Sequence, residues 1–407
     1  MPHPVLTSLK EAQDRLFHAA HQVSRPQAVR CGLADALGAV CAEDVTAPHA
    51  LPPADCAAVD GYAVYTSDLD TPEALPIIGT ARAGHPYAGQ VSPGQALRIF
   101  TGAVMPHGPD CILMHEDCHE KDGQVTTELR LRAGMNIRPR GENLKQGEVL
   151  VRDGQFLSAA DIGQLAAGGI GSLEVYERKK VALISMGDEL VQPGHELSDG
   201  QIYDSNRPML SALLKSHPVI VDEGGAIDDN PERLTAAFSE ALSANDVLIS
   251  TGGASDGIED HTQAALQALG AEVLFWRLAL KPGRPACVAQ LGEKLIFCLP
   301  GNPVAVYVCF MHLVRPALDI IGGGRPRMMK AVCLPSGFDY QKKPGRAEYI
   351  RAILDTDRSG RSIVMPYGRK GAGVISSLTG ADGVVEIPEQ ADKIATGQLV
   401  NFLFFRD

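Results

Sequence analysis

One part of the sequence, from residue 179 to residue 327, constrains the fold more than any other. Unbroken apolar runs such as KKVALIS and KLIFCL alternate there with stretches such as NPERLTAAFSEALSAN, whose apolar residues recur at helical spacing. Such runs are typical of strands covered on both faces, and strands that alternate with helices form mostly parallel sheets. The sequence therefore predicts a doubly wound α/β unit.

The segments on either side predict smaller units. Short apolar runs broken by Gly and Pro fill residues 62–140, and similar runs follow residue 327, a pattern typical of β-rich units. Residues 8–21 show helical spacing with Ser8 as the expected N-cap, and residues 157–171 predict a helix that ends at glycines. A chain of 407 residues has room for about two to four domains, so we expect a multidomain protein of the α/β and β classes.

The composition excludes several classes of protein. Lys and Arg number 37 against 49 Asp and Glu, which gives a formal net charge of −12. An acidic chain binds the nucleic-acid backbone poorly, so no nucleic-acid partner is expected. No unbroken apolar run reaches the roughly 18 residues of a membrane span, and the first residues lack the apolar core of a signal peptide. The nine cysteines include no C-x-x-C pair, which indicates reduced thiols and a cytoplasmic location.

The segment DCILMHEDCHE leaves two interpretations open. Its Cys and His side chains have the chemistry to bind a metal, but structural zinc sites usually have a regular paired spacing. A strand that runs into a turn is the favoured interpretation. The side chains concerned are Cys111, His115, Cys118 and His119.

Glycines, acids and bases follow successive strands of the predicted α/β unit. In an open α/β sheet, ligands bind outside the carboxyl ends of the strands. Glycines let backbone N–H groups approach an anion, and Mg²⁺ prefers carboxylates together with substrate phosphates. Each feature alone also fits a turn or a helix cap, but the combination predicts a phosphate-bearing ligand bridged by a cation. The residues are Gly187, Asp188, Glu189, Asp228, Asp229, Thr251, Gly252, Gly253, Ser255, Gly257, Asp260, Lys281, Pro282, Gly283, Arg284, Pro300, Gly301, Asn302 and Pro303.

The outer segments carry a second set of polar residues. Asp60 follows a proline-rich connection in VDGYAV, and Thr101 lies in the strand-end loop FTGAVMPHGPD. Asp60 also fits an ordinary turn, and the charged residues of NIRPRGEN and GRAEYIR also fit a solvated edge. These charged residues are Arg138, Arg140, Glu142, Arg346, Glu348 and Arg351.

Nine motifs occur in order along the chain: PPADCAAVDGYAV, TGAVMPHGPD, RPRGEN, SMGDEL, YDSN, TGGASDGIED, KPGRP, LPGNPV and GADGVVEIP. In these motifs the sequence resembles the molybdopterin molybdenumtransferases, a family that includes the bacterial MoeA proteins and the E domain of gephyrin. The resemblance covers nearly the whole chain and implies four domains. They are an elongated helical–β domain (1–50 and 141–178), an inserted β-rich domain (51–140), an α/β molybdopterin-binding domain (179–327) and a C-terminal β domain (328–407).

The resemblance also implies a reaction, in which molybdate is inserted into adenylated molybdopterin with release of AMP and dependence on Mg²⁺. It implies a homodimer whose site lies between the subunits, with Asp60 and Thr101 acting from the partner, and the molybdopterin adenylyltransferase as a partner protein. The implied catalytic residues are Asp60, Thr101, Glu189, Asp229, Asp260 and Lys281. The implied metal ligands are Asp188, Glu189, Asp229 and Asp260. The implied substrate-binding residues are Gly252, Gly253, Ser255, Arg277, Arg284, Pro300, Gly301, Asn302, Pro303, Arg346 and Arg351.

Four positions that carry a hydroxyl in the family are apolar in this chain: Ala57, Met186, Ala305 and Ala372. Molybdate is a small dianion that needs hydrogen-bond donors. The loss of hydroxyls therefore keeps a second hypothesis open, a non-catalytic molybdopterin binder or scaffold protein. A third hypothesis is a pterin adenylyltransferase built on the same α/β unit.

Overall fold

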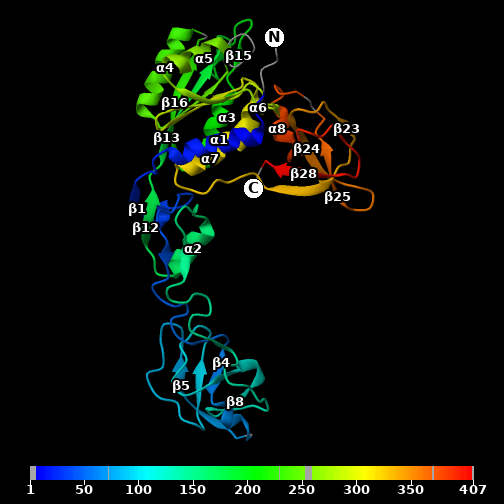
Figure 1. Ribbon diagram of the computed structural model, residues 1–407. Helices are drawn as coiled ribbons and strands as arrows, with labels where there is room; N and C mark the ends of the chain where they lie inside the picture. Colours follow the sequence, from blue (N-terminus) through cyan, green and yellow to red (C-terminus); the bar gives the residue numbers. More distant parts are fainter. Residues whose placement is uncertain (1–5, 72, 229, 253–258, 369–370, 406–407) are drawn as a thin grey trace.

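The computed structural model describes residues 6–71, 73–228, 230–252, 259–368 and 371–405. The molecule is elongated, with a large part at one end and a small β part at the other (Figure 1). We call the large part the head (residues 6–23 and 179–405), the small part the distal unit (residues 51–140), and the slender region between them the neck (residues 24–50 and 141–178). The chain passes through the neck twice, so the distal unit is an insertion.

A six-stranded sheet forms the centre of the head. Its order is β16 (Val219–Ile227), β13 (Lys179–Met186), β17 (Val247–Thr251), β21 (Lys294–Leu299), β20 (Cys287–Leu291) and β18 (Glu272–Trp276). The first four strands are parallel, and β20 is antiparallel to both β21 and β18. Along β13, Val181 and Leu183 enter one apolar core and Ala182 and Ile184 the other. The sheet is therefore covered on both faces, which confirms the predicted fold class.

Helices of the head lie on both faces of this sheet. α4 (Pro231–Ala244) and α5 (Glu259–Ala268) pack on one face, and α3 (Asn206–Leu214), α6 (Pro303–Cys309) and α7 (Arg315–Ile321) pack on the other. The start of α4 follows from its sequence, because Asn230 accepts hydrogen bonds from the N–H groups of Glu232 and Arg233 and Pro231 fits the first turn. A short parallel pair, β14 (Leu190–Val191) with β15 (Ile202–Tyr203), lies between β13 and α3.

The helix after β21 contains a wider turn, because Phe310–Val314 form a π-helix, η4, between α6 and α7. Pro316 has no N–H for the carbonyl of His312, and the side chain of Gln13 donates to that oxygen at 2.9 Å. By length and composition, the whole helix Pro303–Ile321 could cross a membrane. Such a helix was not predicted from the sequence, because its apolar residues do not form one unbroken run. However, 89% of it is buried inside the protein, so its apolar surface belongs to the core of the head.

The first helix, α1 (Leu9–Gln22), also belongs to the head. Ser8 caps it as predicted, by accepting a hydrogen bond from the N–H of Glu11 at 3.1 Å. Its apolar residues lie in the same core as those of η4, α7 and β18. The implied domain 1–50 joins this helix to the neck, whereas the structure buries its apolar face in the head.

The neck is held together by two antiparallel strand pairs and one helix. β1 (Ala28–Gly32) pairs with β12 (Ser172–Tyr176), and β2 (Val45–Thr46) pairs with β11 (Val149–Val151). A short turn, η1 (Leu33–Asp35), follows β1. α2 (Ala159–Ala167) begins at a capping box of Ser158 and Asp161 and is followed by Gly168 and Gly169, which confirms the predicted helix.

A second six-stranded sheet forms the distal unit. Its order is β7 (Cys111–Met114), β4 (Gly61–Val64), β6 (Ala96–Ile99), β5 (Leu75–Ala81), β9 (Gln124–Thr126) and β8 (His119–Lys121). η2 (Thr66–Leu69) follows β4, η3 (His115–Asp117) follows β7, and β3 (Cys56–Ala57) pairs with β10 (Ile137–Arg138). The segment DCILMHEDCHE is thus a strand that runs into a turn, as predicted. Among the described residues, no group of three or more His, Cys, Asp or Glu side chains is arranged to hold a metal ion.

The C-terminal part of the head is a β structure that includes one strand of the α/β segment. Its sheet has the order β19 (Leu280–Lys281), β24 (Ala347–Thr356), β26 (Gly383–Ile387), β28 (Leu399–Phe404) and β22 (Ala331–Pro335), and β25 (Ser362–Pro366) pairs with β24. β23 (Tyr340–Gln341) pairs with β27 (Lys393–Ile394), and α8 (Ser376–Gly380) precedes β26. Because β19 pairs with β24, the loop KPGRP lies where the two β structures of the head meet.

A buried ion pair connects the head with the neck. The guanidinium of Arg327 donates hydrogen bonds to both carboxylate oxygens of Asp319, at 2.7 and 3.1 Å, and lies 3.6 Å from the ring centroid of Phe156 in the neck. Burial alone would raise the pKa of Asp319, but hydrogen bonds from His217 and Arg327 outweigh it, so the pKa is lowered. Asp319 therefore stays ionised although it is only 1% exposed.

Replacing Asp319 by Asn should lower the free energy of unfolding of the head by about 3 kcal/mol, because a partly buried guanidinium loses its anion. Trp276 on β18 is the single tryptophan, so its fluorescence reports unfolding of the head. Since the folded pKa of Asp319 lies below its unfolded value, the pair stabilises the head above about pH 4, and this stabilisation is lost as the pH falls further.

The matched control is Glu11→Gln, which removes an exposed ion pair with Arg15 on α1. It should cost less than about 0.5 kcal/mol. Equal free energies of unfolding of the Asp319→Asn variant and the wild type across this pH range would show that the ion pair does not stabilise the head.

Candidate functional site

Three loops meet at the carboxyl ends of the parallel strands. The N–H of Gly187, after β13, donates to the carbonyl of Ile227 at the end of β16, at 3.2 Å. Gly252, after β17, has φ +89°, and a side chain there would collide with the backbone oxygen of Met186. A Cβ atom on Gly301, after β21, would lie 3.6 Å from the Cα of Gly252. The glycines thus bring three backbones together at the edge where N–H groups can face an anion.

The loop after β21, which contains Pro300, Gly301, Asn302 and Pro303, is held from two sides. The side chain of Asn206 in α3 donates to the carbonyl of Gly301 at 2.7 Å. The N–H of Val304 donates to the carbonyl of Ala372 in the C-terminal β structure, at 3.1 Å. Asn302 is the N-cap residue of α6, but its side chain makes no capping hydrogen bond. The loop therefore has a fixed backbone and an amide side chain that the helix does not use.

Two of the four predicted metal ligands have described side chains. Asp188 and Glu189 follow β13 and are exposed. The carboxylate of Glu189 folds back over Gly187, since a Cβ atom on that glycine would lie 2.5 Å from Oε2. Because β16, β13 and β17 are parallel neighbours, the segments that follow them leave the sheet at one edge. Asp229, Gly253 and Ser255 lie outside the described residues, as does the side chain of Asp260, whose backbone belongs to the first turn of α5.

Lys281 lines a cavity of about 380 Å³ between the KPGRP loop and the C-terminal β structure. Its Nζ lies 3.1 Å from Oε2 of Glu348, and the hydroxyl of Tyr340 donates to the same oxygen at 2.8 Å. Glu348 is buried, whereas the Lys281 side chain is 50% exposed. The carboxylate therefore orients the ammonium group and leaves it accessible from the cavity. Other wall residues are Pro282, Phe338, Asp339, Tyr349, Ile350, Arg351, Pro366, Tyr367, Gly371 and Ala372.

Arg351 is the second cation of this cavity, and it is only 8% exposed. Its Nε donates to the hydroxyl of Ser377 at 3.0 Å, and its Nη2 donates to the carbonyl of Gly371 at 2.8 Å. Burial lowers the pKa of Arg351 from its ordinary 12.5, but a guanidinium stays charged at neutral pH. No described carboxylate forms an ion pair with it, so its charge is available to an anion in the cavity.

The other predicted basic residues lie elsewhere. Arg346 precedes β24 and is not among the residues that line the cavity. Arg277 has φ +65°, and its N–H donates to the carbonyl of Ala286 at 3.1 Å. The carbonyl of Arg284 accepts from the N–H of Leu278 at 2.7 Å. The backbones of Arg277 and Arg284 thus close the KPGRP loop, and the structure brings only Arg351 of the predicted arginines to the described cavity wall.

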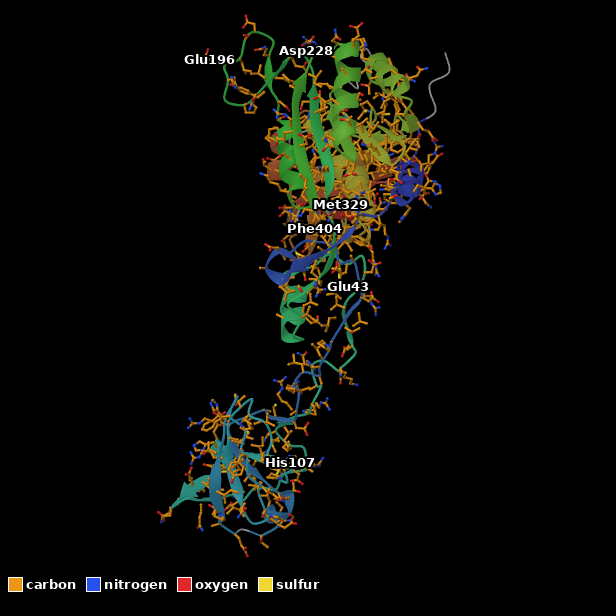
Figure 2. All side chains as sticks on the ribbon, turned by 90° about the vertical axis from the view of Figure 1, so that its left-hand side faces the viewer. Glu43, His107, Glu196, Asp228, Met329 and Phe404 are labelled. Carbon is orange, nitrogen blue, oxygen red and sulfur yellow. The ribbon has the colours of Figure 1, made fainter. Side chains whose placement is uncertain are left out.

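Asp60 and Thr101 form a separate site in the distal unit. The N–H and the hydroxyl of Thr101 both donate to Oδ1 of Asp60 at 2.7 Å, and these two bonds lower the pKa of the Asp60 carboxyl. Figure 2 shows His107 of the distal unit and Asp228, at the end of β16, at opposite ends of the molecule. Within one chain, the whole neck therefore separates the Asp60–Thr101 pair from the site in the head.

Comparisons with known proteins cover nearly the whole chain. Residues 7–169 match the family description MoeA N-terminal region (domain I and II), residues 182–320 match the probable molybdopterin binding domain, and residues 334–405 match the MoeA C-terminal region (domain IV). A Haemophilus influenzae protein named molybdopterin molybdenumtransferase is 34% identical over 375 residues, which span 90% of this chain and 91% of that protein. The chain belongs to the molybdopterin molybdenumtransferase family.

Further relatives support the same family. A Staphylococcus epidermidis molybdopterin molybdenumtransferase is 30% identical over 404 residues, which cover 97% of this chain and 95% of that protein. A crystal structure of the MoeA protein of Pyrococcus horikoshii has a TM-score of 0.83 and 28% identity, and the match covers 98% of this chain and 100% of that one. The predicted family and the predicted transferase class, in molybdenum cofactor biosynthesis, are therefore confirmed.

The structure adds residues to the candidate site that sequence patterns missed. Asn206 stands in the motif YDSN, so its position in a motif was a signal, although nothing indicated its bond to Gly301. Tyr340 and Tyr367 lie outside the motifs. They line the cavity with Lys281 because the C-terminal β structure pairs with β19 through β24.

Replacing Gly252 by Ala should lower the free energy of unfolding of the head by about 2 kcal/mol, because the methyl group adds a backbone collision to the strain of a positive φ. Gly194→Ala is the matched control, since Gly194 has φ +97° but open space around it. The control should cost about 1 kcal/mol from backbone strain alone. Equal losses in both variants, measured by Trp276 fluorescence in urea, would mean that the contact between the loops contributes nothing.

Proposed function

We propose that this protein inserts molybdate into adenylated molybdopterin and releases AMP together with the molybdenum cofactor. The observation that carries the proposal is the cavity lined by Lys281 and Arg351. Its wall also carries two acids: the buried Glu348 lies beside Lys281, and the exposed Asp339 accepts a hydrogen bond from the N–H of Thr396. No described carboxylate forms an ion pair with Arg351, so its guanidinium can bind a small dianion such as molybdate, with Lys281 in the same cavity.

The loops at the sheet edge would bind the phosphate-bearing part of the substrate. Gly252 and Gly301 leave space beside the backbone, and Asn302 offers an amide that α6 does not use. The two regions are neighbours, because the carbonyl of Ala372 in the cavity wall accepts the N–H of Val304. A ligand with phosphates on the loops can therefore present its other end to the cavity.

Mg²⁺ would be held by carboxylates at the same edge, from Asp188, Glu189, Asp229 and Asp260. Carboxylate oxygens suit this ion, and the parallel order of β16, β13 and β17 supports a common position for the segments that carry them. When bound, Mg²⁺ neutralises charge on phosphate oxygens. Asp188 and Glu189 are exposed, so both can turn toward a ligand without unfolding the strand that precedes them.

Asp60 and Thr101 would act on the head of a second subunit in a cytoplasmic homodimer. The separation of the distal unit from the head in one chain supports this arrangement (Figure 1). Thr101 holds the Asp60 carboxylate ionised, and the exposed carboxylate can accept a hydrogen bond from the substrate or from water. The molybdopterin adenylyltransferase would supply the adenylated substrate.

The non-catalytic binder is the second candidate, since four hydroxyl positions of the family are apolar here. Ala57, Met186 and Ala305 are at most 3% exposed, so hydroxyls there would not reach the cavity, whereas Ala372 lines it. Tyr340 and Tyr367 bring hydroxyls to the same wall. Only one of the four changes thus alters the cavity, which favours insertion over binding alone.

Charge removal at Lys281 should lower the affinity for adenylated molybdopterin about tenfold in Lys281→Gln, since a charge-assisted contact is lost. Lys281→Glu should abolish binding, because it sets a second carboxylate beside Glu348. Lys180→Gln is the control, since Lys180 is an exposed residue near the opposite end of β13. Binding is measured by pterin fluorescence, and turnover by AMP release with molybdate and Mg²⁺.

The same measurements on the wild type distinguish the three functions. Tight pterin binding without AMP release would favour the non-catalytic binder, and ATP-dependent pterin adenylation would favour the adenylyltransferase.

Mixing two inactive variants should restore activity if each site combines two subunits. An Asp60→Asn chain and a Lys281→Glu chain should each be inactive, but a mixed dimer contains one complete site. Random pairing in equal amounts should then recover about a quarter of the wild-type AMP release. The control mixes Lys281→Glu with a chain that carries both substitutions, where no complete site can form. Equal activity in the two mixtures would contradict a site shared between subunits.

A further inference from the structure

The edge of the distal sheet that carries Asp60 and Thr101 also carries two basic side chains. Gly61, Ile99, Met114 and Ala81 are register partners near one edge of the sheet. The next residues along the chain are Asp60 before β4, Phe100 and Thr101 after β6, His115 after β7, and Arg82 after β5. Four strand ends therefore bring Arg82 and His115 to the edge occupied by the Asp60–Thr101 pair.

The contacts of Arg82 orient its guanidinium but include no ion pair with a described carboxylate. Its guanidinium lies 5.5 Å from the ring centroid of Phe100, the residue before Thr101. Its backbone forms a tight turn with His85, whose N–H donates to the Arg82 carbonyl at 2.8 Å. Arg82 is exposed, and no carboxylate in the described part of the chain forms an ion pair with it. It is therefore an oriented cation without a local counter-charge.

The ring of His115 is oriented by a chain of hydrogen bonds. The hydroxyl of Tyr62 donates its single proton to Glu120 at 2.6 Å, and Glu120 also pairs with Arg98. The Tyr62 oxygen lies 3.3 Å from Nδ1 of His115, so Nδ1 must carry the proton of that contact. Burial first, and then the bond to Glu120, raise the pKa of Tyr62 to about 12, which keeps its proton in place.

The tautomer leaves Nε2 of His115 for a ligand. The charged and titratable groups around the ring are Asp60, Tyr62, Arg98, Glu116, Asp117, Cys118 and Glu120. The backbone N–H of His115 donates to the Asp60 carbonyl at 3.0 Å, so ring and carboxylate share one edge. The pKa of Cys118 is raised to about 11 by burial, so this thiol stays neutral. In this tautomer Nε2 has no proton, so it can donate a hydrogen bond to an anionic oxygen only when it gains one.

We propose that Arg82 and His115 make the edge around Asp60 an anion-binding surface, which takes the diphosphate of the adenylated substrate held by the head of a second subunit. The assignment of the diphosphate rests on the proposed function. Asp60, Glu116 and Asp117 would repel a phosphate, whereas Glu120 is paired with Arg98, and the contacts of the two basic side chains have to offset that repulsion. Arg82 provides a planar cation suited to two phosphate oxygens, and His115 adds a second donor.

The first test measures anion binding directly, without turnover. The full chain, labelled with ¹⁵N in its histidines, is titrated with inorganic pyrophosphate, and the His115 ring signals are assigned with a His115→Gln variant. The ring should carry its proton on Nδ1 in the free protein, and Nε2 should gain a proton as pyrophosphate binds. Tyr62→Phe should shift the free ring toward the Nε2–H tautomer, because the acceptor for Nδ1–H is gone.

Matched substitutions make the result specific to this edge. Arg82→Gln should weaken the pyrophosphate response of His115 about tenfold, and Arg82→Lys should weaken it less. Arg130→Gln is the control, because Arg130 donates to the carbonyl of Asp70, before the opposite end of β5. A His115 signal that ignores millimolar pyrophosphate, or that responds equally in the wild type and in Arg82→Gln, would overturn the proposal.

The kinetic test separates this proposal from the proposed function. In Arg82→Gln and in His115→Gln, kcat/KM for adenylated molybdopterin should fall about tenfold or more, because the diphosphate that these side chains contact contains the bond broken when AMP is released. Unchanged kcat/KM in both variants, together with loss of binding in Lys281→Glu, would refute the role of Arg82 and His115 and leave the proposed function intact. If the wild type releases no AMP, the proposed function fails, and the pyrophosphate titration still decides whether this edge binds anions.

Discussion

The buried helix from Pro303 to Ile321 makes the contact on which the rest of the head depends. Its side chains share one apolar core with the central sheet and with α1. It also meets the C-terminal β structure, where the ring centroids of His312 and Tyr349 lie 4.5 Å apart. Burial lowers the pKa of His312 to about 4, so this ring is neutral at physiological pH and fits an apolar core.

The two ends of the same helix position the two regions that matter for function. Its first residues belong to the loop that contacts Gly252 and Ala372, at the sheet edge and the cavity wall. Its last turn carries Asp319, which binds Arg327 against Phe156 of the neck. One buried element thus relates the glycine loops at the sheet edge, the cavity lined by Lys281 and Arg351, and the direction in which the neck leaves the head.

Local sequence signals predicted the elements well where a short-range interaction decides the structure. The cap at Ser8 holds as expected, and the caps at Ser158 and Asn230 follow the same rule, because a side-chain oxygen reaches an N–H only two or three residues away. The alternation of apolar runs with helices was equally informative, since burial on both faces of a sheet requires it. The π-helical turn at η4 was not predicted. In the structure, Gln13 of α1, far away in the sequence, donates to the carbonyl of His312 that Pro316 leaves without an N–H partner.

The sequence by itself determined that this chain is a multidomain α/β and β protein of the molybdopterin molybdenumtransferase family, because apolar periodicity and ordered motifs are written along the chain. Only the tertiary structure decided that α1 belongs to the head and that β19 joins the C-terminal sheet. It also decided that Arg351, and not Arg346, lines the cavity with Lys281. These results depend on contacts between segments far apart in the chain, and such contacts leave no local pattern in the sequence.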